Sequence, residues 1–245
     1  TNGVDDTDER ALKVKQVMEK DAVGSLDAWS IQDIALERAS TAREAAKIMG
    51  ELVEKHGFYD AGETMPITDG NEVWIFEVYG NGIWAAWRMP DDHIFVAANR
   101  ARLRNLNLDD KDNVMACPDI VDFAVKNGFL DAKKVDRKNF SPADVYNPSH
   151  ELYAIRREWR VLSLIAPSQT FDPNAMELPM SVVPDKKVSV QDIFAITGDW
   201  YEGTPYDLSK GPAAGPWGNP IRFANSSKTK PDSTWERSIN MMRTC

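Results

Sequence analysis

The chain has 245 residues, which suits one large domain or two small ones, and its 42% hydrophobic and 27% charged residues are ordinary for a globular protein. A net charge of −9 argues against a nucleic-acid partner, since such a partner usually requires a basic surface. No apolar run reaches the roughly 18 residues of a membrane-spanning helix, so we expect no membrane partner.

Cysteine and histidine are scarce. Cys117 and Cys245 are the two cysteines, too few for a disulfide framework or a metal cluster. The three histidines lie far apart in the sequence and form no HExxH motif, so we expect no metal and no other cofactor. The cytoplasm and an exported location both remain open.

Helical patterns dominate the first part of the chain. A short one covers ERALKVKQVMEK, residues 9–20. Apolar residues at helical spacing predict two further helices, over 29–39 and 40–55. Thr41 and Glu44 fit a capping box at the start of the 40–55 helix, and Gly57 is a typical stop signal after it.

The pattern then changes to short apolar and aromatic runs. These are EVWIFEVYG (72–80), GIWAAWRMP (82–90) and HIFVAANRARL (93–103). Turn residues separate them, so we predict three antiparallel strands, with a hairpin at Asn81-Gly82. Both faces of the 72–80 strand are largely apolar, which favours a sheet covered on both sides.

The second half mixes helices with irregular segments. We predict helices over 118–127 and 151–168, a short helix from 189 to 197, and a final strand over 234–245. Helices followed by a sheet and then by more helices indicate an α+β fold, with the sheet sandwiched by helices.

Two polar residues are candidates for chemistry. Asn99 follows the apolar run IFVAA, and its side-chain amide can donate a hydrogen bond to an oxyanion. An ordinary turn asparagine is the alternative. Arg222 follows the turn GNP and can bind a substrate carboxylate through its planar guanidinium, or pair with a surface acid.

The loop over residues 199–223 is rich in glycine, proline and aromatic residues, an unusual combination for a linker. Its glycines and prolines predict an irregular path. Trp200, Tyr206 and Trp217 either line a substrate pocket or pack this path against the core.

Several segments together resemble peptidase family C69, the cysteine-type dipeptidases among the N-terminal nucleophile hydrolases. The loop DWYEGTPYDLSKGPAAGPWGNPIR looks like a signature of that family. The segments ALERASTAREAAKIMGELVEKHGF, GETMPITDGNEVWIFEVYGNGIWAAWRMPDDHIFVAANRARL, REWRVLSLIAPS and STWERSINMMRT resemble it in the same order. The resemblance spans roughly residues 29–244.

The resemblance implies an αββα sandwich, two antiparallel sheets between helical layers. It implies hydrolysis of dipeptides by an N-terminal cysteine whose own α-amino group is the general base. Asn99 would match an oxyanion-hole asparagine, and Arg222 an arginine near the nucleophile. The 199–223 loop, with Trp200, Tyr206 and Trp217, would form a wall of the site for a small peptide substrate.

The chain departs from the family at the nucleophile, because no cysteine-led strand precedes the helices. We therefore expect a single domain over 1–245 that lacks the family's N-terminal portion, with 1–26 a flexible or processed leader. The nucleophile would lie on an N-terminal segment or another chain. The alternatives are a non-catalytic binding or structural remnant of the fold and an amidase for another acyl-amide substrate. Since relatives often assemble, a homo-oligomer is a further expectation.

Overall fold

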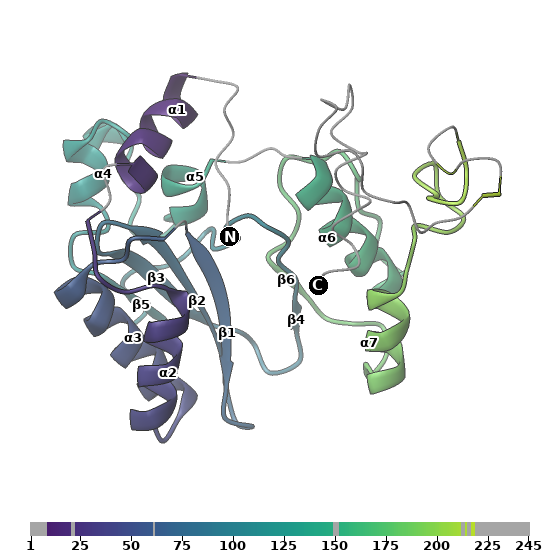
Figure 1. Cartoon of the computed structure of the whole chain (residues 1–245), viewed down its shortest axis with the longest axis horizontal. Coiled ribbons are helices and arrows are strands. Elements are labelled where there is room, and N and C mark those ends of the chain that lie inside the picture. The colour runs from purple at the N-terminus through teal and green to yellow at the C-terminus, as the bar shows by residue number, and fades with distance from the viewer. Residues whose placement is uncertain are drawn as a thin grey trace. The chain divides into compact units, whose positions relative to one another are not determined.

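The computed structural model describes residues 9–20, 23–60, 62–148, 152–211, 214 and 217–218. The chain divides into two compact units, Thr1–Ser149 and His150–Cys245 (Figure 1). Helices and antiparallel strands make the protein α+β, as predicted. The strand predicted over 234–245 lies outside the described residues, and the single-domain expectation stays a prediction.

The described elements of the first unit are helices, then five consecutive strands, then short helices. They are α1 (Glu9–Lys15), a π-helical turn (Gln16–Lys20), α2 (Ala28–Arg38), α3 (Ala42–His56), β1 (Glu63–Thr68), β2 (Val73–Gly80), β3 (Ile83–Arg88), β4 (Ile94–Phe95), β5 (Val114–Ala116), α4 (Asp122–Lys126), a 3-10 turn (Ala132–Lys134) and α5 (Pro142–Tyr146). The second unit contains α6 (Leu152–Ile165), β6 (Ser181–Val182) and α7 (Val190–Thr197).

The helices predicted over 29–39 and 40–55 are confirmed by α2 and α3, whereas only Asp122–Lys126 of the helix predicted over 118–127 is α-helical. Thr41 caps α3, where its hydroxyl accepts the backbone N–H of Glu44 at 3.1 Å. The Glu44 carboxylate accepts the N–H of Ser40 rather than that of Thr41, so only half of the predicted capping box forms. Gly57 ends the helix with φ +70°, a conformation that glycine adopts without strain.

Residues 9–20, inside the expected leader, are helical and packed. Ala11, Val14 and Met18 are all buried. Leu12 is 49% exposed, so only part of the apolar surface of this segment is removed from water, and the expected flexibility of the leader stays a prediction. Processing of this segment stays a prediction.

The main sheet of the first unit has the antiparallel order β1-β2-β3-β5. The hairpin at Asn81-Gly82 is confirmed, with φ +50° and +76° at the two central residues, as a tight turn between twisted strands requires. The third predicted strand is wrong for most of its length. Only Ile94–Phe95 is extended as β4, and it lies outside this four-stranded sheet.

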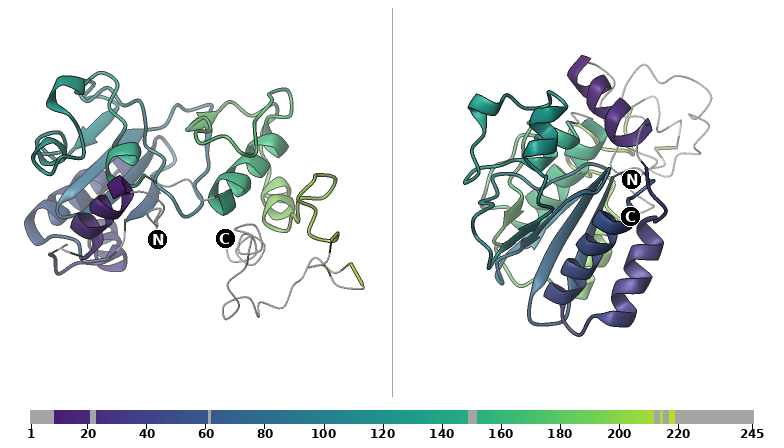
Figure 2. Two further views of the ribbon diagram at one scale, coloured as in Figure 1. Left: turned by 90° about the horizontal axis from the view of Figure 1, so that it is seen from above. Right: turned by 90° about the vertical axis from the view of Figure 1, so that its left-hand side faces the viewer.

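Both faces of β2 are covered, as its sequence predicted. On one face, Phe76 stacks on Trp84 of β3 with ring centroids 5.3 Å apart, and α3 packs over them (Figure 2). On the other face, Tyr79 lies against Tyr146 of α5, with ring centroids 5.5 Å apart. Burial on both faces explains why β2 is almost uniformly apolar.

The second unit is built around α6, whose predicted extent is confirmed to within a few residues. Ile155, Leu162 and Ile165 are buried on one face of this helix, and Trp159 is half-buried. Helix α7 begins at a complete capping box of Ser189 and Asp192. None of the helices in the described ranges combines the length and apolarity needed to cross a membrane.

Candidate active site

Asn99 lies in a bend, four residues after β4 ends, and not at the end of a strand. Its φ of +54° places it in the left-handed region, which asparagine tolerates better than most residues. The residue itself is half-buried, between the buried Ala98 and Arg100. Partial exposure of Asn99 is compatible with a side-chain hydrogen-bond donor at a catalytic site.

The backbone after Asn99 is held by buried side-chain oxygens. The N–H of Ala101 donates to Asn147 Oδ1 at 2.9 Å. The N–H of Arg102 donates to Glu77 Oε1 at 2.6 Å, and the N–H of Leu103 donates to Glu77 Oε2 at 3.1 Å. At residues 101–103, these side chains take the place of a neighbouring strand as acceptors of the backbone N–H groups.

Glu77 is fully buried in the middle of β2. Besides the two amides, its carboxylate accepts hydrogen bonds from Thr64 Oγ1 at 2.9 Å and from Tyr79 Oη at 2.8 Å. Burial raises the pKa of Glu77, and the donors, led by the Arg102 amide, oppose that rise. Sequence reasoning missed Glu77, although an acid with apolar residues on both sides, in VWIFEVY, was a visible signal.

In the second unit, aromatic side chains pack residues 201–208, the part of the predicted loop with described contacts, against α6. Tyr206 makes edge contacts with Trp159 of α6 and with Tyr201, and its ring face lies 4.2 Å from the guanidinium carbon of Arg156. Tyr201 and Leu208 are buried in the same cluster. Tyr201 and Tyr206 therefore pack this part of the irregular path onto the helix, which is one of the two alternatives that the sequence left open for the loop aromatics.

Two carboxylates shape the described part of this loop. Asp199 forms a bidentate ion pair with Arg160 of α6, with N···O distances of 2.8 and 2.7 Å. Asp207 accepts from the backbone N–H and hydroxyl of Ser209 at 2.9 and 2.6 Å. The Ser209 hydrogen bonds lower the pKa of Asp207 to about 2, so its carboxylate is charged at neutral pH.

The other predicted loop residues differ in exposure. Trp217 is 90% exposed and Trp200 is 37% exposed, so both present aromatic surface to solvent. Tyr206 is half-buried, and the packing just described occupies much of its ring. Arg222 lies outside the described residues.

We expect Asp199→Ala to loosen the loop, because it leaves the Arg160 guanidinium, only 13% exposed, without its bidentate partner. Hydrogen exchange of the backbone amides of residues 200–210 should accelerate by at least about tenfold. Asp172→Ala, which removes an acid from another loop turn of the same unit, is the matched control. Unchanged exchange in the Asp199 variant would show that the aromatic cluster alone holds the loop.

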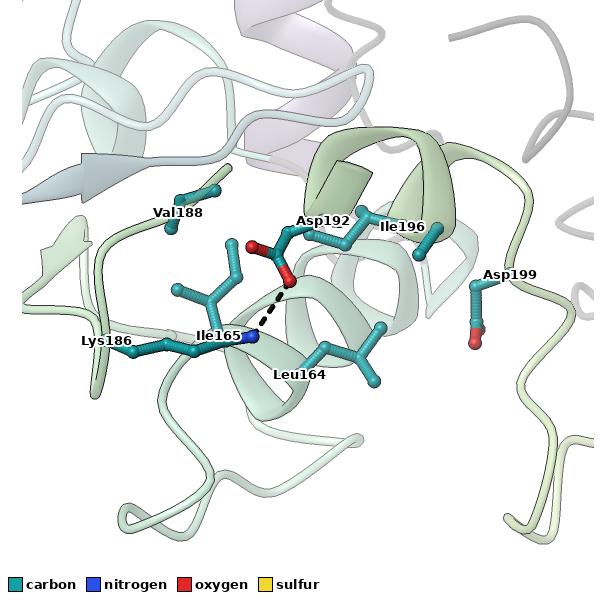
Figure 3. A pocket seen from close by; sticks show the side chains of 8 residues that line it. Leu164, Ile165, Lys186, Val188, Asp192, Ile196 and Asp199 are labelled. Carbon is teal, nitrogen blue, oxygen red and sulfur yellow. Dashed lines mark hydrogen bonds and ion pairs between the residues drawn. The ribbon is translucent and has the colours of Figure 1, made fainter. Parts of the chain in front are cut away.

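A cavity of about 170 Å³ opens in the second unit between α6 and α7 (Figure 3). Its walls are mostly apolar, from Leu164, Ile165 and Ile196, and Lys186 pairs with Asp192 at its side, at 2.9 Å. The volume is below the roughly 300 Å³ of common ligand pockets, and the ion pair satisfies both charges. Its lining includes none of the predicted site residues that the structure describes, Asn99, Trp200, Tyr206 and Trp217.

A family model for peptidase family C69 matches residues 5–243. The chain belongs to peptidase family C69. It is 30% identical over 188 residues to a "Probable dipeptidase" of Salmonella dublin, covering 73% of this chain and 41% of that protein. It is 30% identical over 218 residues to a "Probable dipeptidase" of Latilactobacillus sakei, covering 88% and 42% of the two chains.

A "Dipeptidase" of Bifidobacterium longum is 26% identical over 204 residues, which cover 77% of this chain and 38% of that protein. The C69 chain thus spans about two fifths of the length of the curated relatives it matches. The motifs of the sequence predicted a resemblance to this family, and the family match confirms it.

Cys117 of this C69 chain has the character of a core residue. It is buried, and burial raises the pKa of its thiol to about 12. A thiol with such a pKa is almost entirely protonated at neutral pH and is a poor nucleophile. Within the described ranges, no three His, Cys, Asp or Glu side chains gather closely enough to hold a metal ion.

Proposed function

We propose that these 245 residues are part of a dipeptidase that hydrolyses dipeptide amide bonds through an N-terminal cysteine located outside them. The observation that carries this proposal is the C69 match over residues 5–243, together with relatives whose names state dipeptidase activity. The buried, protonated thiol of Cys117 is consistent with a nucleophile placed elsewhere.

In the proposed reaction, the α-amino group of the N-terminal cysteine takes the proton of its own thiol. The thiolate attacks the carbonyl carbon of the dipeptide, and the carbonyl oxygen becomes an oxyanion to which the Asn99 amide donates a hydrogen bond. The amine product leaves with a proton, and water then hydrolyses the thioester to release the second amino acid and the free thiol.

The remaining site assignments belong to the same proposal. Arg222 would stabilise the thiolate or the substrate carboxylate through its guanidinium. Trp200 and Trp217, with exposed aromatic surface, would contact the side chains of a small peptide substrate. Tyr206 would hold that wall in shape through its contacts with Trp159 and Arg156.

We also propose that the complete fold is an αββα sandwich. The β1-β2-β3-β5 sheet would supply one of its two sheets, and α2 and α3 one of its helical layers. Assembly of such units into a homo-oligomer is a further proposal.

The test is hydrolysis of a dipeptide panel by the full-length protein, together with its N-terminal sequence and intact mass. We expect release of free amino acids, a mature N-terminal cysteine, and unchanged kcat in the Cys117→Ala variant. Cleavage of N-acyl amides without dipeptide cleavage would favour an acyl-amide amidase. A protein without an N-terminal cysteine that cleaves neither class would be a non-catalytic member of the family.

A further inference from the structure

Three successive backbone amides follow Asn99 at a distance of only two to four residues, and all three donate to side chains. Ala101 donates to Asn147, whereas Arg102 and Leu103 donate to the two oxygens of Glu77. Both acceptor residues are buried. The position of the Asn99 bend therefore depends on two side chains from distant parts of the sequence.

Glu77 is a rigid anchor for this backbone. It lies inside the sheet, opposite Thr64 of β1 and Ala85 of β3, so its main chain is paired on both sides. Hydroxyl groups of Thr64 and Tyr79 hold one carboxylate oxygen each. Each oxygen thus has one hydroxyl donor and one amide donor, and the carboxylate has little freedom to rotate.

A carboxylate at this position is costly for folding alone. Removing an acid from water is unfavourable unless hydrogen bonds replace its hydration, and an apolar side chain would fill the same space without that cost. A leucine at position 77, however, would leave the amides of Arg102 and Leu103 without their acceptor. The benefit of the acid lies in where it holds those two amides.

We propose that Glu77 is a positioning residue for Asn99, holding the backbone that carries the oxyanion donor in its left-handed bend. The inference rests on the proposed function, because Asn99 must act in the reaction for its position to matter. Asn147 contributes in the same way through the amide of Ala101. A displacement of about 1 Å in such a donor can cost up to about 100-fold in rate.

The decisive variant is Glu77→Gln in the full-length protein. Glutamine has nearly the same shape as glutamate, but an NH2 group replaces one of the two carboxylate oxygens. Because an NH2 group cannot accept a hydrogen bond, one of the two amides, Arg102 or Leu103, loses its acceptor. We expect kcat on a dipeptide to fall about 10- to 100-fold while KM changes less than about threefold. Glu51→Gln, the same substitution at an exposed position of α3, is the matched control, and its kcat should stay within about threefold of the parent.

A double-mutant cycle separates positioning from a general structural effect. If Glu77 acts through Asn99, Glu77→Gln should reduce kcat in the parent but scarcely at all in the Asn99→Ala background. Equal reductions in both backgrounds would overturn the inference. So would a Glu77→Gln variant whose kcat is unchanged.

If the proposed function is wrong, the kcat values of the variants differ in another way. Full activity of Asn99→Ala would remove Asn99 from the mechanism and this inference with it, whereas a slow Asn99→Ala enzyme with additive effects would overturn the inference alone. Hydrogen exchange at the Arg102 and Leu103 amides should accelerate in Glu77→Gln, and unchanged exchange would also overturn it. If Glu77→Gln does not fold, Asn147→Ala serves for the same cycle.

Discussion

Replacement of Asn99 by alanine in the full-length protein should lower kcat for dipeptide hydrolysis by about 100-fold or more, the usual scale for one oxyanion donor. Alanine removes the side-chain amide that would stabilise the tetrahedral oxyanion. Because this stabilisation arises in the transition state, KM should change much less than kcat. Steady-state kinetics on one dipeptide at saturating and limiting concentrations measures both quantities.

Two control variants distinguish the loss of the Asn99 side-chain amide from a change in the backbone conformation. Asn105 has the same φ of +54° and is exposed, so Asn105→Ala introduces similar backbone strain without touching Asn99. Its kcat should stay close to that of the parent. Asn99→Gly adopts the left-handed conformation easily but lacks the amide, and should be as slow as Asn99→Ala. Recovery of activity in the glycine variant would instead make the role of Asn99 conformational.

Replacement of Gly50 by alanine should destabilise the first unit by about 1–3 kcal/mol, the range for overpacking a core. Gly50 lies on the buried face of α3, where an added Cβ would be 2.1 Å from Cζ2 of Trp84. Trp84 has little room to move, because it stacks on Phe76 and its indole N–H donates to Glu54 Oε1 at 2.9 Å. This steric cost should exceed the roughly 1 kcal/mol by which alanine favours a helix over glycine.

Denaturant unfolding of the parent and of the Gly50→Ala variant measures this difference. Glu51→Ala, at the neighbouring exposed position of α3, is the matched control and should change stability by less than about 0.5 kcal/mol. A gain in stability for Gly50→Ala would mean that Trp84 yields to the new methyl group and that helix propensity dominates.

Local signals in the sequence located several elements correctly. The spacing of apolar residues, the Thr41 cap and Gly57 placed α3, since a helix depends on contacts within about four residues. The pair Asn81-Gly82 placed the hairpin, because few residue pairs tolerate two successive positive φ angles. The motif series located the family in the same way, through short segments in a fixed order.

Contacts between distant residues account for what was missed. β1 contains Pro66 and polar residues, so it reads as a loop, yet it pairs with β2 along six positions at an outer place in the sheet order. The third run read as a strand through Asn99. The strand β4 ends at Phe95, and the amides of residues 101–103 donate to Asn147 and Glu77 instead of to a neighbouring strand.

By itself, the sequence determined the family, the main helices, the central hairpin and Asn99 as a candidate donor, because each depends on a few neighbouring residues or on a linear motif. Only the tertiary structure decided the surroundings of Asn99, in particular its bend and the buried Glu77 that holds the following backbone. The physical reason is that Glu77 lies 25 and 26 positions before the amides it accepts. The local preferences of the residues do not predict such a pairing, because it forms only when distant parts of the chain come together in the folded state.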